Sequence, residues 1–280
     1  MKGTMRGIAV SLMLVGASVV VTACQSDPDI DITKLGVETD PPDVLYKQGL
    51  ANMNAGNMTE ASRKFEAIDK QYPFTEWGQK ALVMQTFIAT RTNKNDVAIT
   101  SGSRFLRQYP RSKDAAYVQY MIGLAYSKQI SDVTQDQRAA QRTIEAMNKV
   151  VNDYPSSEYV ADAQAKIRFA RDQLAGREMQ VGRYYLERKE YLAAVSRFRI
   201  VVEQYQNTNQ IEEALARLTE AYYAMGLVDE AQTAAAVLGN NYPDSQWYAD
   251  SYKLLKGQGL EPRENKGSWI SRAGKKLIGA

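Results

Sequence analysis

The chain has 280 residues and a formal net charge of +3, from 35 Lys and Arg against 32 Asp and Glu. This near balance gives no electrostatic basis for a nucleic-acid partner, and the absence of His excludes His-ligated metals and Ser-His-Asp catalysis. A single cysteine, Cys24, excludes a disulfide within the chain, and we expect neither a metal nor another cofactor.

The N-terminal segment has a short basic start and then an apolar run over residues 8–21. This run has the length of a signal-peptide core and is short for a membrane span. The Val-Thr-Ala-Cys sequence at residues 21–24 resembles the bacterial lipobox. The resemblance implies removal of residues 1–23 and acylation of Cys24, whose several acyl chains would suffice for stable anchoring. In many bacteria that have such lipoproteins, an Asp directly after the acylated cysteine keeps the protein in the inner membrane. Gln25 stands at this position, which favours sorting to the outer membrane. The alternative is an ordinary secretory signal followed by a chance cysteine.

The stretch after the cysteine is acidic and rich in proline. Residues 25–43 contain six acidic residues, one lysine and three prolines. A segment of this composition has too little apolar surface to form a core of its own. We therefore predict a flexible tether over residues 24–42, between the lipid anchor and the folded part.

From residue 43 onward the pattern is helical, and a short module recurs five times. Each copy reads polar-Tyr-(Pro)-x-Ser/Thr, and its tyrosines are Tyr72, Tyr109, Tyr154, Tyr205 and Tyr242. The tyrosine is expected to close one helix, and the proline prevents that helix from continuing. The hydroxyl residue is expected to cap the next helix. These predicted N-caps are Thr75, Ser112, Ser157, Thr208 and Ser245.

Between the modules, small and aromatic residues follow the tetratricopeptide pattern. The fullest copies are Gly49, Ala61, Phe65 and Pro73 in the first unit, and Gly182, Tyr185, Ala194 and Phe198 in the fourth. The small residues allow the two helices of a unit to approach closely. The sequence therefore predicts an all-α, tetratricopeptide-like solenoid of helical hairpins, with about five units and a capping helix from Ser245 to near Gly257.

The spacing between successive module tyrosines is 37, 45, 51 and 37 residues, against a standard period of about 34. The second value predicts an insertion, which we assign to residues 129–137. The third predicts one long helix within residues 156–190, about 50 Å in length, with Gly176 and Gly182 as candidate kink points. We expect a sub-array of units one to three over residues 43–155 and a second sub-array, with the cap, over residues 156–257.

Residues 258–280 end the chain as a basic tail. Residues 268–278 place Trp269, Ile270 and Ala273 on one helical side and their basic residues elsewhere. Such a short amphipathic segment suits contact with a partner or a membrane surface. A disordered tail is the equal alternative.

Several local sequences sharpen the interpretation. They are Pro41-Pro42, Tyr72-Pro73-Phe74, Tyr-Val-Gln-Tyr-Met-Ile-Gly-Leu at residues 117–124 and Tyr-Tyr-Leu-Glu-Arg at residues 184–188. With the lipobox and the irregular spacing, they resemble the BamD (ComL/YfiO) family of the β-barrel assembly machinery. The resemblance covers about residues 41–255 and leaves out the basic tail.

This resemblance implies a lipoprotein on the periplasmic face of the outer membrane that does no covalent chemistry. Its C-terminal repeats would hold the POTRA domains of a BamA-like barrel subunit, alongside other assembly-machinery lipoproteins. Its N-terminal repeats would receive the C-terminal segments of unfolded outer-membrane proteins.

Substrate segments of this kind are amphipathic and end in an aromatic residue with a free carboxylate, so their capture needs an apolar cleft and a cation. The candidate substrate-binding residues are Tyr46, Phe74, Arg104, Tyr109, Tyr117 and Tyr120. The candidate partner-binding residues are Arg183, Tyr184, Glu187, Arg188, Arg197 and Arg199. An arginine such as Arg197 could bind a carboxylate with two hydrogen bonds. For every one of these residues, packing or a solvated helix face is the alternative role.

Two other functions are open to a lipoprotein of this kind. One is another outer-membrane tetratricopeptide lipoprotein, such as a secretin pilotin or a cell-envelope coordinating adaptor. The other is an enzyme, such as a peptidoglycan hydrolase, but the repeats leave no room for a catalytic domain, and no paired carboxylates stand out.

Overall fold

The computed structural model describes residues 40–275, and these residues contain helices and no strand. The helices are α1 (Pro42–Asn54), α2 (Met58–Gln71), α3 (Glu76–Arg91), α4 (Asn95–Gln108), α5 (Ala115–Ser127), α6 (Arg138–Asp153), α7 (Val160–Glu187), α8 (Tyr191–Gln204), α9 (Ile211–Ala224), α10 (Val228–Asn241), α11 (Gln246–Lys256) and α12 (Trp269–Gly274). Within this part of the chain, no helix is both long enough and apolar enough to cross a bilayer.

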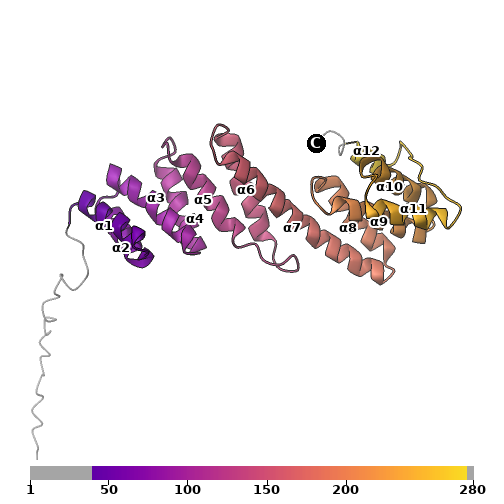
Figure 1. The fold of residues 1–280 in the computed structure, drawn as a ribbon, viewed down its shortest axis with the longest axis horizontal. Helices are drawn as coiled ribbons and strands as arrows, with labels where there is room; N and C mark the ends of the chain where they lie inside the picture. Colours follow the sequence, from indigo (N-terminus) through magenta and orange to yellow (C-terminus); the bar gives the residue numbers. More distant parts are fainter. Residues whose placement is uncertain (1–39, 276–280) are drawn as a thin grey trace, which may run out of the picture. The chain divides into compact units, whose positions relative to one another are not determined.

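Helices α1 to α10 form five antiparallel hairpins that follow one another in chain order (Figure 1). Each helix packs mainly against its neighbours in the chain, so every hairpin buries its apolar side on the next one. Helix α11 packs on α9 and α10 at the end of the array. The prediction of an all-α repeat fold with five units and a capping helix is confirmed.

The repeated tyrosine ends the second helix of every unit. Tyr72, Tyr109, Tyr154, Tyr205 and Tyr242 are the C-caps of α2, α4, α6, α8 and α10, with φ between −124° and −137°. In each case the tyrosine N–H donates to the carbonyl four residues earlier, and the extended φ then turns the chain out of the helix. The rings are half-buried, where they cover the joint to the next hairpin.

The hydroxyl residue of the module acts as predicted in only two copies. Thr75 accepts from the N–H of Gly78 at 3.2 Å and Ser245 from that of Trp247 at 3.2 Å, at the starts of α3 and α11. The N-cap predictions for Ser112, Ser157 and Thr208 are wrong, because α5, α7 and α9 begin three residues later.

A tight turn precedes the helix in these three copies. Ser112 and Ser157 accept from the N–H two residues onward, which closes that turn. Thr208 instead donates its hydroxyl to the carbonyl of Tyr205 at 2.7 Å. The hydroxyl thus stabilises the connection between units rather than the first turn of the helix.

Glycines bring the two helices of a hairpin together. A Cβ on Gly49 would stand 2.7 Å from the ring of Phe65, and one on Gly123 would stand 2.6 Å from the sulfur of Met147. A Cβ on Gly182 would also overlap the fully buried ring of Phe198. Only a residue without a side chain leaves room for these large groups.

The irregular spacing has the two predicted causes. Residues 129–137 form a non-helical connection between α5 and α6, and α7 is a continuous helix of 28 residues, about 42 Å long. The two features touch, since Val133 lies over Gly176, and Arg177 donates to the carbonyl of Thr134 at 3.3 Å. Gly176 and Gly182 thus make room for the side chains of Val133 and Phe198. Helix α7 continues without a break through both of these candidate kink points.

Residues 258–275 form a C-terminal strap, which neither alternative for the basic tail describes. The strap returns along α10, where Gln232 donates to the carbonyl of Glu261 at 2.6 Å and Asn265 donates its N–H to Thr233 at 3.1 Å. It ends in α12, which packs on α8 and α10 and buries Ile270 completely. The apolar side of the segment is therefore used inside the chain. Residues 276–280 lie outside the described part.

We predict that Gly182→Ala lowers the free energy of unfolding by about 1–3 kcal/mol, because the new methyl group would displace the Phe198 ring. The gain in helix propensity is too small to offset this overpacking. Urea unfolding followed by circular dichroism measures the difference.

Gly176→Ala in the same helix is the matched control. Its Cβ would stand 3.2 Å from Val133, which lies in a loop that can move slightly. We expect a change within about 1 kcal/mol. Equal losses at the two positions would contradict the close-packing role of Gly182.

Candidate binding surfaces

The lipidation site predicted at Cys24 lies outside the described residues, together with the signal peptide and nearly all of the tether. The other candidate residues all lie in the repeats, where their surroundings can be read directly. The structure does not gather either candidate set into one site.

Tyr46 lies on α1 beside two aromatic rings. Its ring centroid is 5.3 Å from that of Phe65 and 5.5 Å from that of Trp77 on α3. Lys80 lies over the Trp77 ring at 4.8 Å and pairs with Glu76. Burial raises the pKa of Tyr46 above its ordinary value. Tyr46 therefore belongs to a group of three aromatic rings, with the Lys80 cation over the ring of Trp77.

Tyr117 and Tyr120 on α5 both pack against Tyr159, the N-cap of α7. The ring centroids are 5.3 Å and 5.0 Å from that of Tyr159, and Tyr120 is nearly parallel to it. Tyr120 donates its hydroxyl to Asp162 at 2.8 Å, and its pKa is raised by burial and by this carboxylate. Tyr117 and Tyr159 line a cavity of about 630 Å³ that also has Lys113 on its wall.

The aromatic groups around Tyr46 and around Tyr159 lie near the starts of α1, α3, α5 and α7, which are the first helices of four successive hairpins. Between them, Gln79 of α3 donates to Ser112 at 2.8 Å. Burial raises the pKa of Tyr46 and of Tyr159, and the charge of Asp114 adds a smaller contribution to both. We call residues Tyr46, Trp77, Lys80, Tyr117, Tyr120 and Tyr159 the aromatic row. Sequence reasoning missed Trp77, Lys80 and Tyr159. A signal existed, since Trp77 and Tyr159 each stand two residues after a module hydroxyl residue.

The other substrate candidates do not join the row. Arg104 on α4 pairs with the buried carboxylate of Asp69 on α2. Tyr109 caps the same helix beside Phe105, and its buried hydroxyl has no hydrogen-bond partner among residues 40–275. Phe74 is 80% exposed in the turn before α3. Arg104 therefore braces two neighbouring hairpins.

Three partner candidates contact side chains of other helices in the chain. Arg183 on α7 binds Glu213 on α9 with two hydrogen bonds of 2.7 Å, and Glu213 also accepts from Arg217. These cations hold the pKa of Glu213 below its usual range, although burial opposes them.

Arg197 and Arg199 have different neighbours, although both lie on α8. Arg197 donates to Glu178 on α7 at 3.1 Å. Arg199 lies over the ring of Trp269 in the strap at 4.8 Å and pairs with Glu203. Arg199 therefore holds the strap in place.

The remaining three partner candidates share an exposed surface at the end of α7. Tyr184 is 54% exposed, and Arg188 lies over its ring at 5.4 Å. Glu187 is exposed and has no hydrogen-bond or ion-pair partner within residues 40–275. Leu192, on the other side of the same turn, is 69% exposed. We call these four residues the α7–α8 turn surface.

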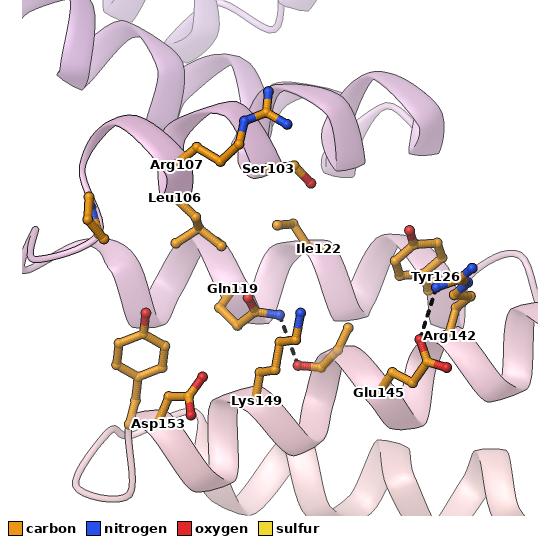
Figure 2. Close-up of a pocket in the computed structure, with 13 residues that line it drawn as sticks. Ser103, Leu106, Arg107, Gln119, Ile122, Tyr126, Arg142, Glu145, Lys149 and Asp153 are labelled. Atoms are coloured by element: carbon orange, nitrogen blue, oxygen red, sulfur yellow. Dashed lines mark hydrogen bonds and ion pairs between the residues drawn. The ribbon is translucent and has the colours of Figure 1, made fainter.

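One further cavity was not foreseen from the sequence. It measures about 440 Å³ and lies between α4, α5 and α6 (Figure 2). Leu106, Ile122 and Tyr126 give it an apolar floor, and Arg107 and Lys149 project along its edges. It shares no residue with the aromatic row or the α7–α8 turn surface.

Known proteins resemble this chain over most of its length. Residues 38–238 match a family described as "Outer membrane lipoprotein". The chain is 38% identical over 255 residues to the outer membrane protein assembly factor BamD of Caulobacter vibrioides, which covers 91% of this chain and 82% of that protein. It is 34% identical over 246 residues to the protein of the same name from Rickettsia prowazekii, covering 88% and 95%. The chain therefore belongs to the YfiO family of outer membrane lipoproteins, which includes these BamD assembly factors.

Proposed function

We propose that this protein is a non-enzymatic subunit of the machinery that folds and inserts β-barrel proteins into the outer membrane. The observation that carries the proposal is its 38% identity, over 91% of the chain, to a protein named as an outer membrane protein assembly factor. A stack of hairpins with separate exposed surfaces suits a scaffold that holds several proteins at once.

The partner surface we assign is the α7–α8 turn surface, for contact with the POTRA domains of a BamA-like subunit. Tyr184 and Leu192 are among the most exposed large apolar side chains of the described residues, and exposed aromatic and arginine side chains are typical interface anchors. Arg183 and Arg197 support this surface from beneath, because they tie α7 to α9 and α8 to α7. Their role is to hold the turn in position.

The substrate surface we assign is the aromatic row. Its rings can cover the apolar side of an unfolded segment, and Lys80 can receive the terminal carboxylate. Lys113 adds a second cation at the cavity beside Tyr117. This placement moves the substrate site from the scattered candidates to the starts of the first helices of units one to four.

The anchor we assign is an acylated Cys24, which would hold the repeats at the periplasmic face of the outer membrane. A lipid on the N-terminal residue leaves all of residues 40–275 free for proteins. The family description as a lipoprotein supports this arrangement.

A mild-detergent pull-down from outer membranes, read by mass spectrometry, tests the partner surface. We expect a POTRA-bearing β-barrel protein to accompany the tagged protein in near-equal amount. The double variant Tyr184→Ala, Leu192→Asp should reduce that amount about tenfold or more, because it removes the apolar anchors of the interface.

Leu227→Asp is the matched control, since Leu227 is an exposed leucine at the corresponding turn between α9 and α10. We expect it to retain the barrel protein. If the unaltered protein recovers a secretin or peptidoglycan-bound proteins and no POTRA-bearing barrel protein, the proposed function is wrong, and the description of the fold is unaffected.

A labelled peptide with an amphipathic sequence, a terminal aromatic residue and a free carboxylate tests the substrate surface by fluorescence anisotropy. We predict that Lys80→Glu weakens its binding about three- to tenfold, because the carboxylate loses its cation. Amidation of the peptide should weaken binding to the parent protein to a similar extent.

Lys70→Glu provides the control. Lys70 pairs with a glutamate four residues earlier, as Lys80 does, but lies on α2. An equal loss from both lysine variants would indicate a general charge effect and would exclude the aromatic row as the carboxylate site.

The anchor is tested by Cys24→Ala. We expect the variant to lose its acyl mass and to move from the detergent phase to the aqueous phase, because one residue carries all the acyl chains. Unchanged partitioning of the variant would show that another segment attaches the protein to the membrane.

A further inference from the structure

The cavity between α4, α5 and α6 is a groove on the side of the second helices (Figure 2). Gln119 on its floor donates to the carbonyl of Ala146 at 3.0 Å, which ties α5 to α6. Arg142 pairs with Glu145 at 3.0 Å on one edge. Arg107 and Lys149 have no ion-pair partner within residues 40–275, so both cations are available to a ligand.

The same position two hairpins later is filled by the strap. Helix α12 packs on α8 and α10, as a ligand in the groove would pack on α4 and α6. Counting back from the tyrosines that end α4, α6, α8 and α10 gives counterparts for the groove residues of α4 and α6, and counting forward from Tyr109 and Tyr205 gives them for those of α5. The pairs are Ser103 with Arg199, Leu106 with Val202, Arg107 with Glu203, Arg142 with Glu230, Lys149 with Val237, and Tyr126 with Tyr222.

Four of these counterparts contact the strap directly. Trp269 donates its indole N–H to Tyr222 at 3.1 Å beneath Arg199. Ser268 donates to Glu230 at 2.6 Å, and a Cβ on Gly274 would stand 2.6 Å from Val237. A short helix with one tryptophan and small residues therefore fits this type of groove.

The two grooves differ in charge. The filled groove presents Glu203 and Glu230 beside Arg199, and the strap over it is basic. In the open groove, arginines replace both glutamates, and Lys149 replaces Val237. Its edges carry three cations against Glu145 and Asp153. Ser103, in place of Arg199, leaves the space above the floor open.

We infer that the groove between α4 and α6 binds a short amphipathic helix of another protein, with carboxylates placed to meet Arg142 and Lys149. The helix lies as the strap does on α8 and α10, with an aromatic residue over Tyr126. The groove contains none of the residues of the aromatic row or of the α7–α8 turn surface, although Asp153 and Tyr154 line both it and the cavity beside Tyr117. It therefore offers a third polypeptide its own set of contacts.

The probe is a labelled peptide based on residues 266–275 of the strap. It carries Ser268→Asp and Gly274→Glu, which face Arg142 and Lys149 in the proposed register, and Lys266→Glu and Lys275→Glu. The unaltered strap peptide is the control. Fluorescence anisotropy with the whole protein in mild detergent should show binding of the acidic peptide, with the basic peptide at least about tenfold weaker.

Two variants locate the site. Lys149→Glu should weaken binding of the acidic peptide about tenfold, because a charge-assisted contact is replaced by repulsion. Ser103→Tyr should abolish binding, because its ring would occupy the space that Ser103 leaves. Lys253→Glu on α11 makes the same charge change on another exposed lysine and should have no effect.

Four results would each overturn the inference. Absence of binding shows that the groove takes no such helix, and binding that survives both Lys149→Glu and Ser103→Tyr lies elsewhere. Equal affinity for the unaltered strap peptide shows that the groove suits the strap of a second copy. A gain of about tenfold or more on removal of residues 25–39 shows that the chain's own acidic segment fills the groove.

Discussion

The closeness of the two helices within a hairpin is the constraint on which the rest of the array depends. Where Gly49, Gly123 and Gly182 face Phe65, Met147 and Phe198, the missing side chain makes room for the largest buried groups of the unit. Hairpins held at this distance repeat with a fixed offset, so corresponding residues of different units fall in corresponding places. That regularity places the side chains of the aromatic row in line. It also means that the α4–α6 groove and the strap site are lined by equivalent positions of equivalent helices, which carry different charges.

Much of the fold could be predicted because its signals are local. A tyrosine that ends a helix and the proline that prevents its continuation are adjacent in sequence, and a glycine and the aromatic ring it faces belong to the two helices of one hairpin. The position of the connection at residues 129–137 and the presence of one long helix after it followed from the spacing and from the absence of proline, although α7 is about 42 Å long and not about 50 Å. Three of the five N-cap predictions failed for a physical reason, since a hydroxyl side chain can close a turn before a helix as readily as it can cap the first turn.

The candidate sites were harder to predict because their contacts are long-range. Nothing near Arg183 or Arg104 in sequence reveals that Glu213 and Asp69 will meet them across neighbouring hairpins. The strap had an ambiguous pattern for the same reason, since an amphipathic segment has the same spacing whether its apolar side meets a partner, a membrane or its own chain. Trp77 and Tyr159 could have been predicted from the sequence, because each stands two residues after a module hydroxyl residue.

The strap also sets the order in which the protein can be completed. Ile270 fills the space between α8 and α10 from a position near the end of the chain, and Trp269 reaches Tyr222 from there. A chain made from its N-terminus can close the first hairpins early, because each needs only its immediate neighbours. Its last hairpins keep an uncovered apolar seam until residue 275 has emerged, so a molecule cut short by even a few turns would carry that exposed seam and be open to proteolysis.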